Sequence, residues 1–240
     1  MAHDRETVTL WTAQRQVVLD TLIRDGIYKV KRAYIDEKYQ ETAWIFQEAY
    51  SFFRETASAI LPPPEGAQSG IWLYQDPQWA GVSADALLLK LEVPADQAIF
   101  FDLHLWNRIL NLQFLGKDPQ EEQAFARELE RLGLKSTLPL FQTSYYPLQR
   151  RAVRQSWRRL FESPLPPKTY RQAATWVLEK GWLREVRYPE EMVQQQILFL
   201  CGGPGTFHGN SAKHLCLQYA VYTAGRGVFM ENYIIFERRA

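Results

Sequence analysis

Apolar residues recur along the chain with two different spacings, and each spacing predicts a different kind of element. Residues 8–11 form a short apolar run that we interpret as a strand, and Thr12 is expected to cap a helix that follows directly. Gly26 lies where such a helix usually ends. The apolar stripe expected for this helix consists of Val18, Leu19, Leu22 and Ile23.

A second helix is predicted over residues 41–60, and the proline-rich stretch 62–66 ends it. Residues 70–75 then resemble a strand, and residues 98–102 are either a further strand or a bend into a helix that follows. The mostly apolar run LLLKLEVP at residues 87–94 is typical of a strand buried on both faces. The buried face expected for the helix consists of Phe46, Ala49, Tyr50, Phe53, Ala57 and Ile60.

The second half of the chain carries its own start and stop signals. The motif Asp118-Pro119-Gln120-Glu121 combines a capping box with proline at the first helical position, and Gly133 ends the predicted helix. Another helix is expected over residues 148–161. Residues 170–178 and 182–188 are predicted to form a hairpin that turns at residues 179–181.

These elements are interspersed without clean alternation, which favours an α+β fold with a mixed, mainly antiparallel sheet and helices packed around it. We expect residues 1–189 to form a single domain. The composition changes after Pro189, where glycine and small residues become frequent, so residues 190–240 are interpreted as a C-terminal appendage.

Composition and charge exclude several function classes. The net charge of +1 provides no global field for nucleic acid or anionic lipid, and no apolar run is long enough to span a bilayer. Cys201 and Cys216 show no CxxC spacing, and His208 and His214 do not have the spacing of a helical zinc pair. We therefore expect a cytoplasmic protein with no metal site and no membrane association.

Arginines gather on the helix predicted over residues 148–161. Arg150, Arg151, Arg154 and Arg158 fall on a single arc beside its apolar stripe. Such an arc can bind the phosphates of a nucleotide or of RNA, and Arg151, Arg154 and Arg158 are the predicted phosphate-binding residues. The alternative is a solvated helix face whose arginine stems cover apolar neighbours.

The eight tryptophans suggest a second candidate site, because several aromatic rings in one pocket can stack on a ring-shaped ligand. If the predicted strands pair in one sheet, polar and aromatic side chains of separate segments converge in a cleft. The alternative is a tryptophan-rich core with a few satisfied polar groups. The side chains concerned are Trp11, Thr12, Tyr50, Trp72, Tyr74 and Gln172.

Several short motifs occur along the chain, among them Leu10-Trp11-Thr12, Ala49-Tyr50, Pro63-Pro64-Glu65-Gly66, Ile71-Trp72, Leu105-Trp106 and Gln172-Ala173. Their order resembles a bacterial family catalogued only as a domain of unknown function. The resemblance covers residues 8–188 and leaves out the appendage. That family usually has Asp and His around its Leu-Trp pair, where this chain has His104 and Asn107.

A more distant resemblance is to the ADP-ribosyltransferase and RNA 2′-phosphotransferase group. It implies that NAD is the cofactor, that Thr12 holds the nicotinamide ribose and that Tyr50 or Tyr74 stacks on nicotinamide, with Trp11 and Trp72 beside them. Gln172 would then be the catalytic residue, although its amide can orient a hydroxyl and cannot act as a general base.

Two functional hypotheses from different classes follow. The first is an NAD-binding, ADP-ribosyltransferase-like enzyme with a toxin or defence role. The second is a non-catalytic module that uses the tryptophan-rich cleft or the arginine-rich helix to bind a nucleotide, peptide or RNA. A purely structural subunit is a third alternative.

Overall fold

The computed structural model describes residues 6–81 and 85–188, and these residues form two compact units. In its described part, unit 1 contains residues 6–28, 76–81, 85–94 and 179–188. Unit 2 contains residues 29–75 and 95–178. Both units contain helices and antiparallel strand pairs, which confirms the predicted α+β class. The predicted domain boundary at residue 189 stays a prediction.

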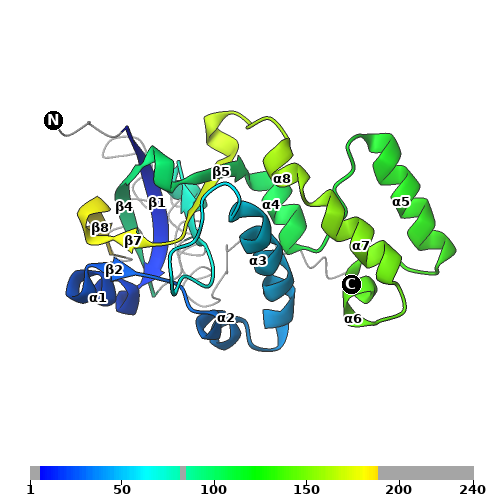
Figure 1. Ribbon diagram of the computed structural model, residues 1–240, viewed down its shortest axis with the longest axis horizontal. Coiled ribbons are helices and arrows are strands. Elements are labelled where there is room, and N and C mark those ends of the chain that lie inside the picture. The colour runs from blue at the N-terminus through cyan, green and yellow to red at the C-terminus, as the bar shows by residue number, and fades with distance from the viewer. Residues whose placement is uncertain (1–5, 82–84, 189–240) are drawn as a thin grey trace, which may run out of the picture. The chain divides into compact units, whose positions relative to one another are not determined.

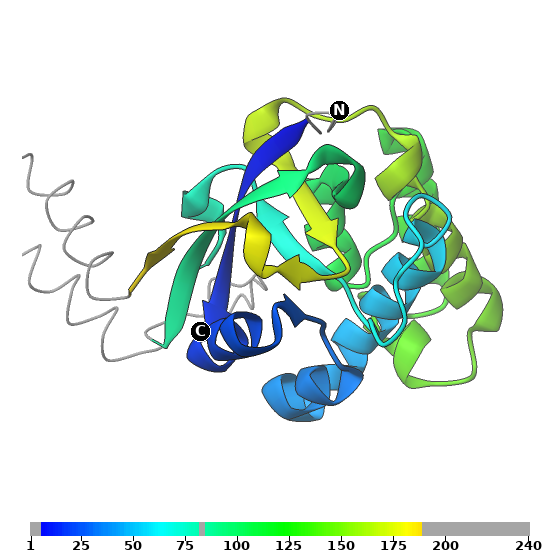
Figure 2. The same ribbon diagram turned by 60° about the vertical axis from the view of Figure 1, so that its left-hand side comes forward.

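Unit 1 is built on strand β4, which pairs with a strand on either side. β1 and β4 run antiparallel over nine residues, from Thr7 opposite Pro94 to Arg15 opposite Ala86. β8 is antiparallel to β4 on its other edge. Figure 2 shows β1 in dark blue, with β4 and the yellow β8. The bounds are β1 (Thr7–Arg15), β4 (Ala86–Pro94) and β8 (Leu183–Arg187).

The run predicted as a doubly buried strand is β4, and its residues Ala86 to Leu89 are all buried. Helix α1 (Gln16–Asp25) follows β1 and ends as predicted, because Gly26 adopts the left-handed conformation with φ of 76°. Val18, Leu19 and Leu22 are buried. Ile23 was expected on the same stripe, but it is 50% exposed.

Thr12 does not cap a helix, so that prediction was wrong. β1 continues to Arg15, and Thr12 lies in its middle opposite Leu89 of β4. Arg15 precedes α1 and provides no side-chain hydrogen bond to it. Pairing with the long strand β4 therefore overrides the local capping preference of threonine.

Unit 2 has its own three strands, with β6 between β3 and β5. Both pairings are antiparallel, and Gln172 of β6 lies opposite Tyr74 of β3 and Phe101 of β5. The bounds are β3 (Ile71–Tyr74), β5 (Ile99–Asp102) and β6 (Arg171–Thr175). Two further strands of two residues are β2 (Ile27–Tyr28) of unit 1 and β7 (Leu178–Glu179).

The predicted hairpin of residues 170–178 and 182–188 was also wrong. β6 pairs with β3 and β5, whereas β8 pairs with β4. Between them lie β7 and a 3-10 turn at Lys180–Trp182. Both strands were predicted correctly. Each of them nevertheless pairs with strands that are distant in the sequence and not with the other strand of the predicted hairpin.

Helices form the rest of unit 2. The helix predicted at residues 41–60 is α3, preceded by a helix α2 that the pattern did not show, because only Ile35 of α2 is buried. The helix predicted at residues 148–161 divides near Trp157 into α7 and α8. The bounds are α2 (Arg32–Tyr39), α3 (Ala43–Ala57), α4 (Leu103–Leu110), α5 (Pro119–Arg131), α6 (Leu138–Gln142), α7 (Pro147–Ser156) and α8 (Arg159–Glu162).

The elements of unit 2 meet around an aromatic core. Phe53 of α3 is its centre and is 1% exposed. Edge-to-face and tilted ring pairs of this kind add to the stabilisation from burial alone. The rings within 4.9 to 6.0 Å of Phe53 belong to Trp72, Phe101, Trp106, Phe161 and Trp176.

Helix α5 lies beside α7 in Figure 1, and the amide of Gln149 donates to Glu128 across this contact at 2.8 Å. The start of α5 is the best-predicted local feature. Asp118 caps it by accepting from the N–H of Glu121 at 2.8 Å, and Gly133 follows its end with φ of 71°. Strong local signals therefore placed this helix correctly.

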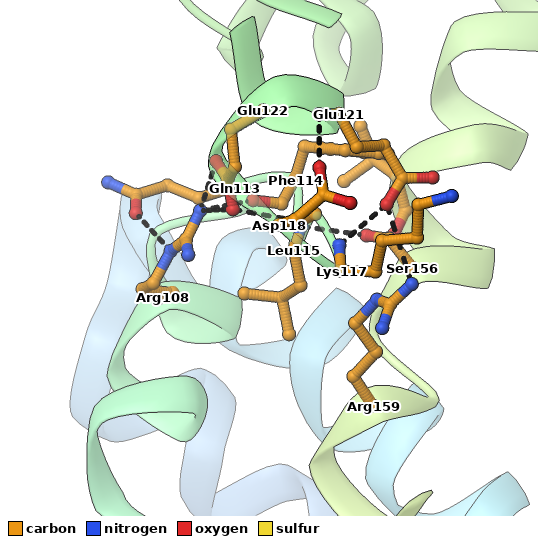
Figure 3. Close-up of polar contacts among 12 residues, drawn as sticks. Arg108, Gln113, Phe114, Leu115, Lys117, Asp118, Glu121, Glu122, Ser156 and Arg159 are labelled. Atoms are coloured by element: carbon orange, nitrogen blue, oxygen red, sulfur yellow. Dashed lines mark hydrogen bonds and ion pairs between the residues drawn. The ribbon is translucent and has the colours of Figure 1, made fainter. Parts of the chain in front are cut away.

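A polar network holds the loop between α4 and α5 (Figure 3). Arg108 donates to both carboxylate oxygens of Glu122, at 2.7 and 2.8 Å, and the N–H of Gly116 donates to the same carboxylate at 2.8 Å. Glu121 accepts from the N–H of Lys117 at 2.6 Å. The loop is thus fixed by charge-assisted hydrogen bonds from both of its ends.

Candidate functional site

The arginines on helix α7 and just after it fall into two groups that differ in exposure. Pro147 occupies the first turn, and Val153 is the only buried residue of the helix. Arg150 and Arg154 flank this residue and are half-buried. Arg151 and Arg158 lie farther round, and both are exposed. α7 ends at Ser156, so Arg158 lies just beyond it, and the arginines predicted on one arc differ in environment.

A groove lies between α3 and the segment that runs from α6 to α8, and its volume is about 890 Å³. All four arginines of the arc line this groove. The wall from α3 includes Phe52, Glu55 and Thr56. We refer to this whole cavity as the arginine groove. Its size is that of an ordinary small-ligand site.

Glu48 of α3 neutralises part of this positive charge. Its carboxylate accepts hydrogen bonds from Arg150 and from Arg154, one on each oxygen, and its side chain is 20% exposed. Arg154 also lies 3.3 Å from a carboxylate oxygen of the exposed Glu55. In addition, the Arg150 guanidinium lies 5.5 Å from the ring centre of Phe141.

Arg151 and Arg158 are not paired in this way, although Glu162 also lines the groove. Within residues 6–81 and 85–188, neither side chain forms a hydrogen bond or an ion pair. Two exposed guanidinium groups thus line the groove with their donors available. A guanidinium group presents paired N–H donors that match the oxygens of a phosphate.

A second cavity adjoins the arginine groove and has a volume of about 630 Å³. The two cavities share Glu55 and Arg154, the members of the 3.3 Å ion pair. The second cavity is also lined by Trp44, Gln142 and Arg32. We refer to it as the Trp44 cavity.

The arginines were predictable from the sequence, whereas the residues of α3 that face them were not predicted. Glu48 and Glu55 are seven residues apart on one helix, which places them on the same face two turns apart. That spacing was a usable signal, although nothing local indicated which helix lies opposite. Trp44 precedes Glu48 by one turn and gave no signal of its own.

The predicted aromatic site is partly assembled in unit 2. Tyr50 and Trp72 have ring centres 5.1 Å apart, and Tyr74 pairs directly with Gln172. Trp72, Tyr74 and Gln172 share one face of the sheet. Trp72 and Tyr74 are two residues apart on β3, and Gln172 lies directly opposite Tyr74. Tyr50, Tyr74 and Gln172 are buried, at 9%, 8% and 0% exposure, and Trp72 is half-buried.

Gln172 departs from a fully satisfied core. Its side chain is completely buried, and within the described part of the chain neither amide atom has a hydrogen-bond partner. The indole N–H of Trp106, which faces the same aromatic core, also has none there. Buried polar atoms normally have partners, so this arrangement is unusual.

Trp11 and Thr12 belong to unit 1, where each is buried on strand β1. Lys90 lies 5.6 Å and Arg187 4.6 Å from the ring of Trp11. The hydroxyl of Thr12 accepts from Gln14 at 2.8 Å. Both residues thus have contacts within unit 1, and their predicted role in binding NAD stays a prediction.

Glu185 of β8 lies beside these two cations. A hydrogen bond from Arg187 lowers the pKa of Glu185 below its ordinary value, and Lys90 adds to the effect. The carboxylate therefore keeps its charge next to the cations that cover Trp11.

Two further expectations concern metal sites and membranes. His208, His214, Cys201 and Cys216 lie outside the described residues. Within the described part, no group of three or more His, Cys, Asp or Glu side chains is arranged to hold a metal ion. Every helix described there is also too short or too polar to cross a bilayer.

The fold and the groove define an α+β protein with antiparallel strand pairs and an arginine-lined surface cavity. The chain belongs to the family described as domain of unknown function (DUF3841), whose model matches residues 9–184. This confirms the resemblance predicted for residues 8–188. Neither a curated protein nor a solved structure matches the chain, and the comparisons provide no evidence for the ADP-ribosyltransferase likeness.

Proposed function

We propose that this protein binds the phosphate groups of an anionic ligand in the arginine groove. The observation that carries the proposal is that four arginines line one cavity while Glu48 and Glu55 pair with only two of them. Arg151 and Arg158 then provide the first contacts for the ligand. The chemistry is that of the predicted binding module, with Arg154 as the third phosphate contact.

The low net charge supports a local site over a broad basic surface. With a net charge of +1, long-range attraction of nucleic acid is weak, so binding has to come from the groove itself. The groove concentrates four arginines on one short segment of the chain. Short-range guanidinium contacts therefore account for the affinity that we expect.

Calorimetry with inorganic pyrophosphate tests the proposal. The double variant Arg151→Gln/Arg158→Gln should bind at least about tenfold more weakly, because each charge-assisted hydrogen bond contributes roughly 1.5–3 kcal/mol. Affinity of the wild type should fall as salt rises, because salt screens the attraction between pyrophosphate and the guanidinium groups. Arg127→Gln is the control, since Arg127 is exposed on α5 and lines neither cavity.

The same loss of binding free energy per arginine removed in the control and in the double variant would show that binding follows total charge and would end the groove proposal. Absence of pyrophosphate binding to the wild type would do the same. Thermal unfolding of each variant tests whether the substitutions change binding without changing the stability of the fold.

An NAD-binding, ADP-ribosyltransferase-like activity is a second proposal, and the observation that favours it is the buried amide of Gln172, which has no hydrogen-bond partner among the described residues. A ligand that reached this amide would satisfy it. The Trp-Thr corner that suggested the likeness is not formed, since α1 begins at Gln16. Incubation with NAD tests this activity directly, and no release of nicotinamide by the wild type would reject it.

A further inference from the structure

The arginine groove and the Trp44 cavity are separated by a weak partition. Both are lined by Glu55 and Arg154, whose side chains approach to 3.3 Å. The Glu55 side chain is 67% exposed, and exposed ion pairs of this type contribute little to stability. An anion that contacts Arg154 can therefore replace Glu55 and join the two cavities.

Trp44 gives the second cavity an available aromatic face. It lies in the first turn of α3 and is half-buried, and within the described residues its indole makes no ring contact and no hydrogen bond. Most other tryptophans of unit 2 are packed in ring clusters, as Trp72, Trp106 and Trp157 are. A half-exposed indole beside a cavity is the surface on which a planar ring can stack.

Polar groups around Trp44 are suited to the edge of a heterocyclic base. Gln142 is exposed at the end of α6, and Ser51 lies on the same face of α3 as Trp44, two turns farther along. An amide offers one acceptor and two donors, and a hydroxyl offers both functions. Stacking combined with such edge contacts is how proteins bind unstacked nucleobases.

We propose that the ligand is a nucleotide, with its phosphates held by Arg151, Arg154 and Arg158 and its base stacked on Trp44 in the adjoining cavity. This inference rests on the proposed phosphate-binding function and adds the class of ligand. A free nucleotide and the terminal nucleotide of an RNA share this chemistry. The base subsite is distinct from the aromatic core around Phe53.

Calorimetry with ADP and with inorganic pyrophosphate separates the base subsite from the phosphate subsite. The wild type should bind ADP about tenfold more tightly than pyrophosphate, because base stacking on an aromatic side chain contributes about that factor. Trp44→Ala should remove this preference and leave pyrophosphate affinity unchanged. Trp44→Phe should keep most of it, since an aromatic face is retained.

Tyr145→Ala is the matched control, because Tyr145 is 82% exposed near α7 but lines neither cavity. Pyrophosphate binding without a preference for ADP would overturn the base subsite and leave the phosphate site intact. Loss of the preference in Tyr145→Ala instead of Trp44→Ala would overturn the assignment to Trp44. No binding of either ligand would overturn both proposals.

Competition with a short oligoadenylate distinguishes the two sources of the nucleotide. Displacement of ADP by the RNA that depends on Trp44 supports a terminal nucleotide as the ligand. ADP binding that the RNA leaves unchanged supports a free nucleotide. Thermal unfolding of Trp44→Ala and Trp44→Phe confirms that the variants compared are folded.

Discussion

At the scale of single residues, Glu48 sets how much positive charge the arginine groove can offer. It pairs with Arg150 and Arg154 and is itself 80% covered, as its exposed fraction of 20% shows. A carboxylate in this position stabilises the helix contact and competes with an anionic ligand. Stability and affinity are therefore expected to change in opposite directions when its charge is removed.

Glu48→Gln should lower the free energy of unfolding by at least about 1 kcal/mol, because the amide keeps only one acceptor oxygen for the two arginines and carries no negative charge. The same change should strengthen pyrophosphate binding several-fold, since Arg150 and Arg154 lose their counter-charge. Denaturant unfolding and calorimetry measure the two effects. Glu130→Gln on the exposed face of α5 serves as the control and should change neither quantity.

Gln172 is a second residue whose environment makes a definite prediction. Gln172→Leu should raise the free energy of unfolding by about 1 kcal/mol, because a buried amide without partners is replaced by an apolar side chain of similar size. Denaturant unfolding measures the difference, with the exposed Gln123→Leu as the control. A clear loss of stability would mean that the amide is satisfied in the folded protein.

At the scale of elements, the connection between α4 and α5 is held in place because its backbone N–H groups donate hydrogen bonds to carboxylates of α5 (Figure 3). Gly116 has no room for a side chain there. A Cβ atom at this position would lie 2.7 Å from Cγ and 2.9 Å from the backbone nitrogen of Glu122. The same Glu122 carboxylate accepts from Arg108 and from Gly116.

Gly116→Ala should therefore destabilise the protein by about 1–3 kcal/mol, the usual range for forcing extra volume into a packed site. Thermal unfolding measures the change. Gly181→Ala is the matched control, because a Cβ atom there would meet nothing within 4 Å. Equal stability of the two variants would show that the α4–α5 loop can rearrange to accept the methyl group, and that its hydrogen bonds do not hold it in place.

At the scale of the whole molecule, each unit has its own buried apolar residues. In unit 1, Leu10, Leu22 and Leu89 are fully buried, and in unit 2 the aromatic core surrounds Phe53. Each group of elements thus has the apolar contacts that a compact unit requires. The family model matches residues 9–184, which covers nearly all of the described elements.

A chain that ends at Tyr188 should consequently keep cooperative thermal unfolding, because the described elements of both units already contain many buried apolar residues. Circular dichroism of this variant and of the full chain measures the transition. If truncation abolished the cooperative transition, residues 189–240 would be part of the core, and the predicted boundary would be wrong.

The sequence by itself determined the elements whose signals are local. Asp118, Pro119 and Gly133 placed α5, Gly26 placed the end of α1, and an apolar run placed β4. Local signals succeed here because capping and backbone preferences act between residues a few positions apart. The arginine arc was predicted for the same reason, since helical periodicity is a local property.

Only the tertiary structure decided which elements meet. Thr12 became a strand residue because it pairs with Leu89, and β6 joined β3 and β5 instead of β8. Glu48 and Arg150 are 102 positions apart, so no local pattern could show that α3 supplies the counter-charge of α7. Whether an arginine is neutralised or available depends on such distant partners, because ion pairing and burial are properties of the packed chain.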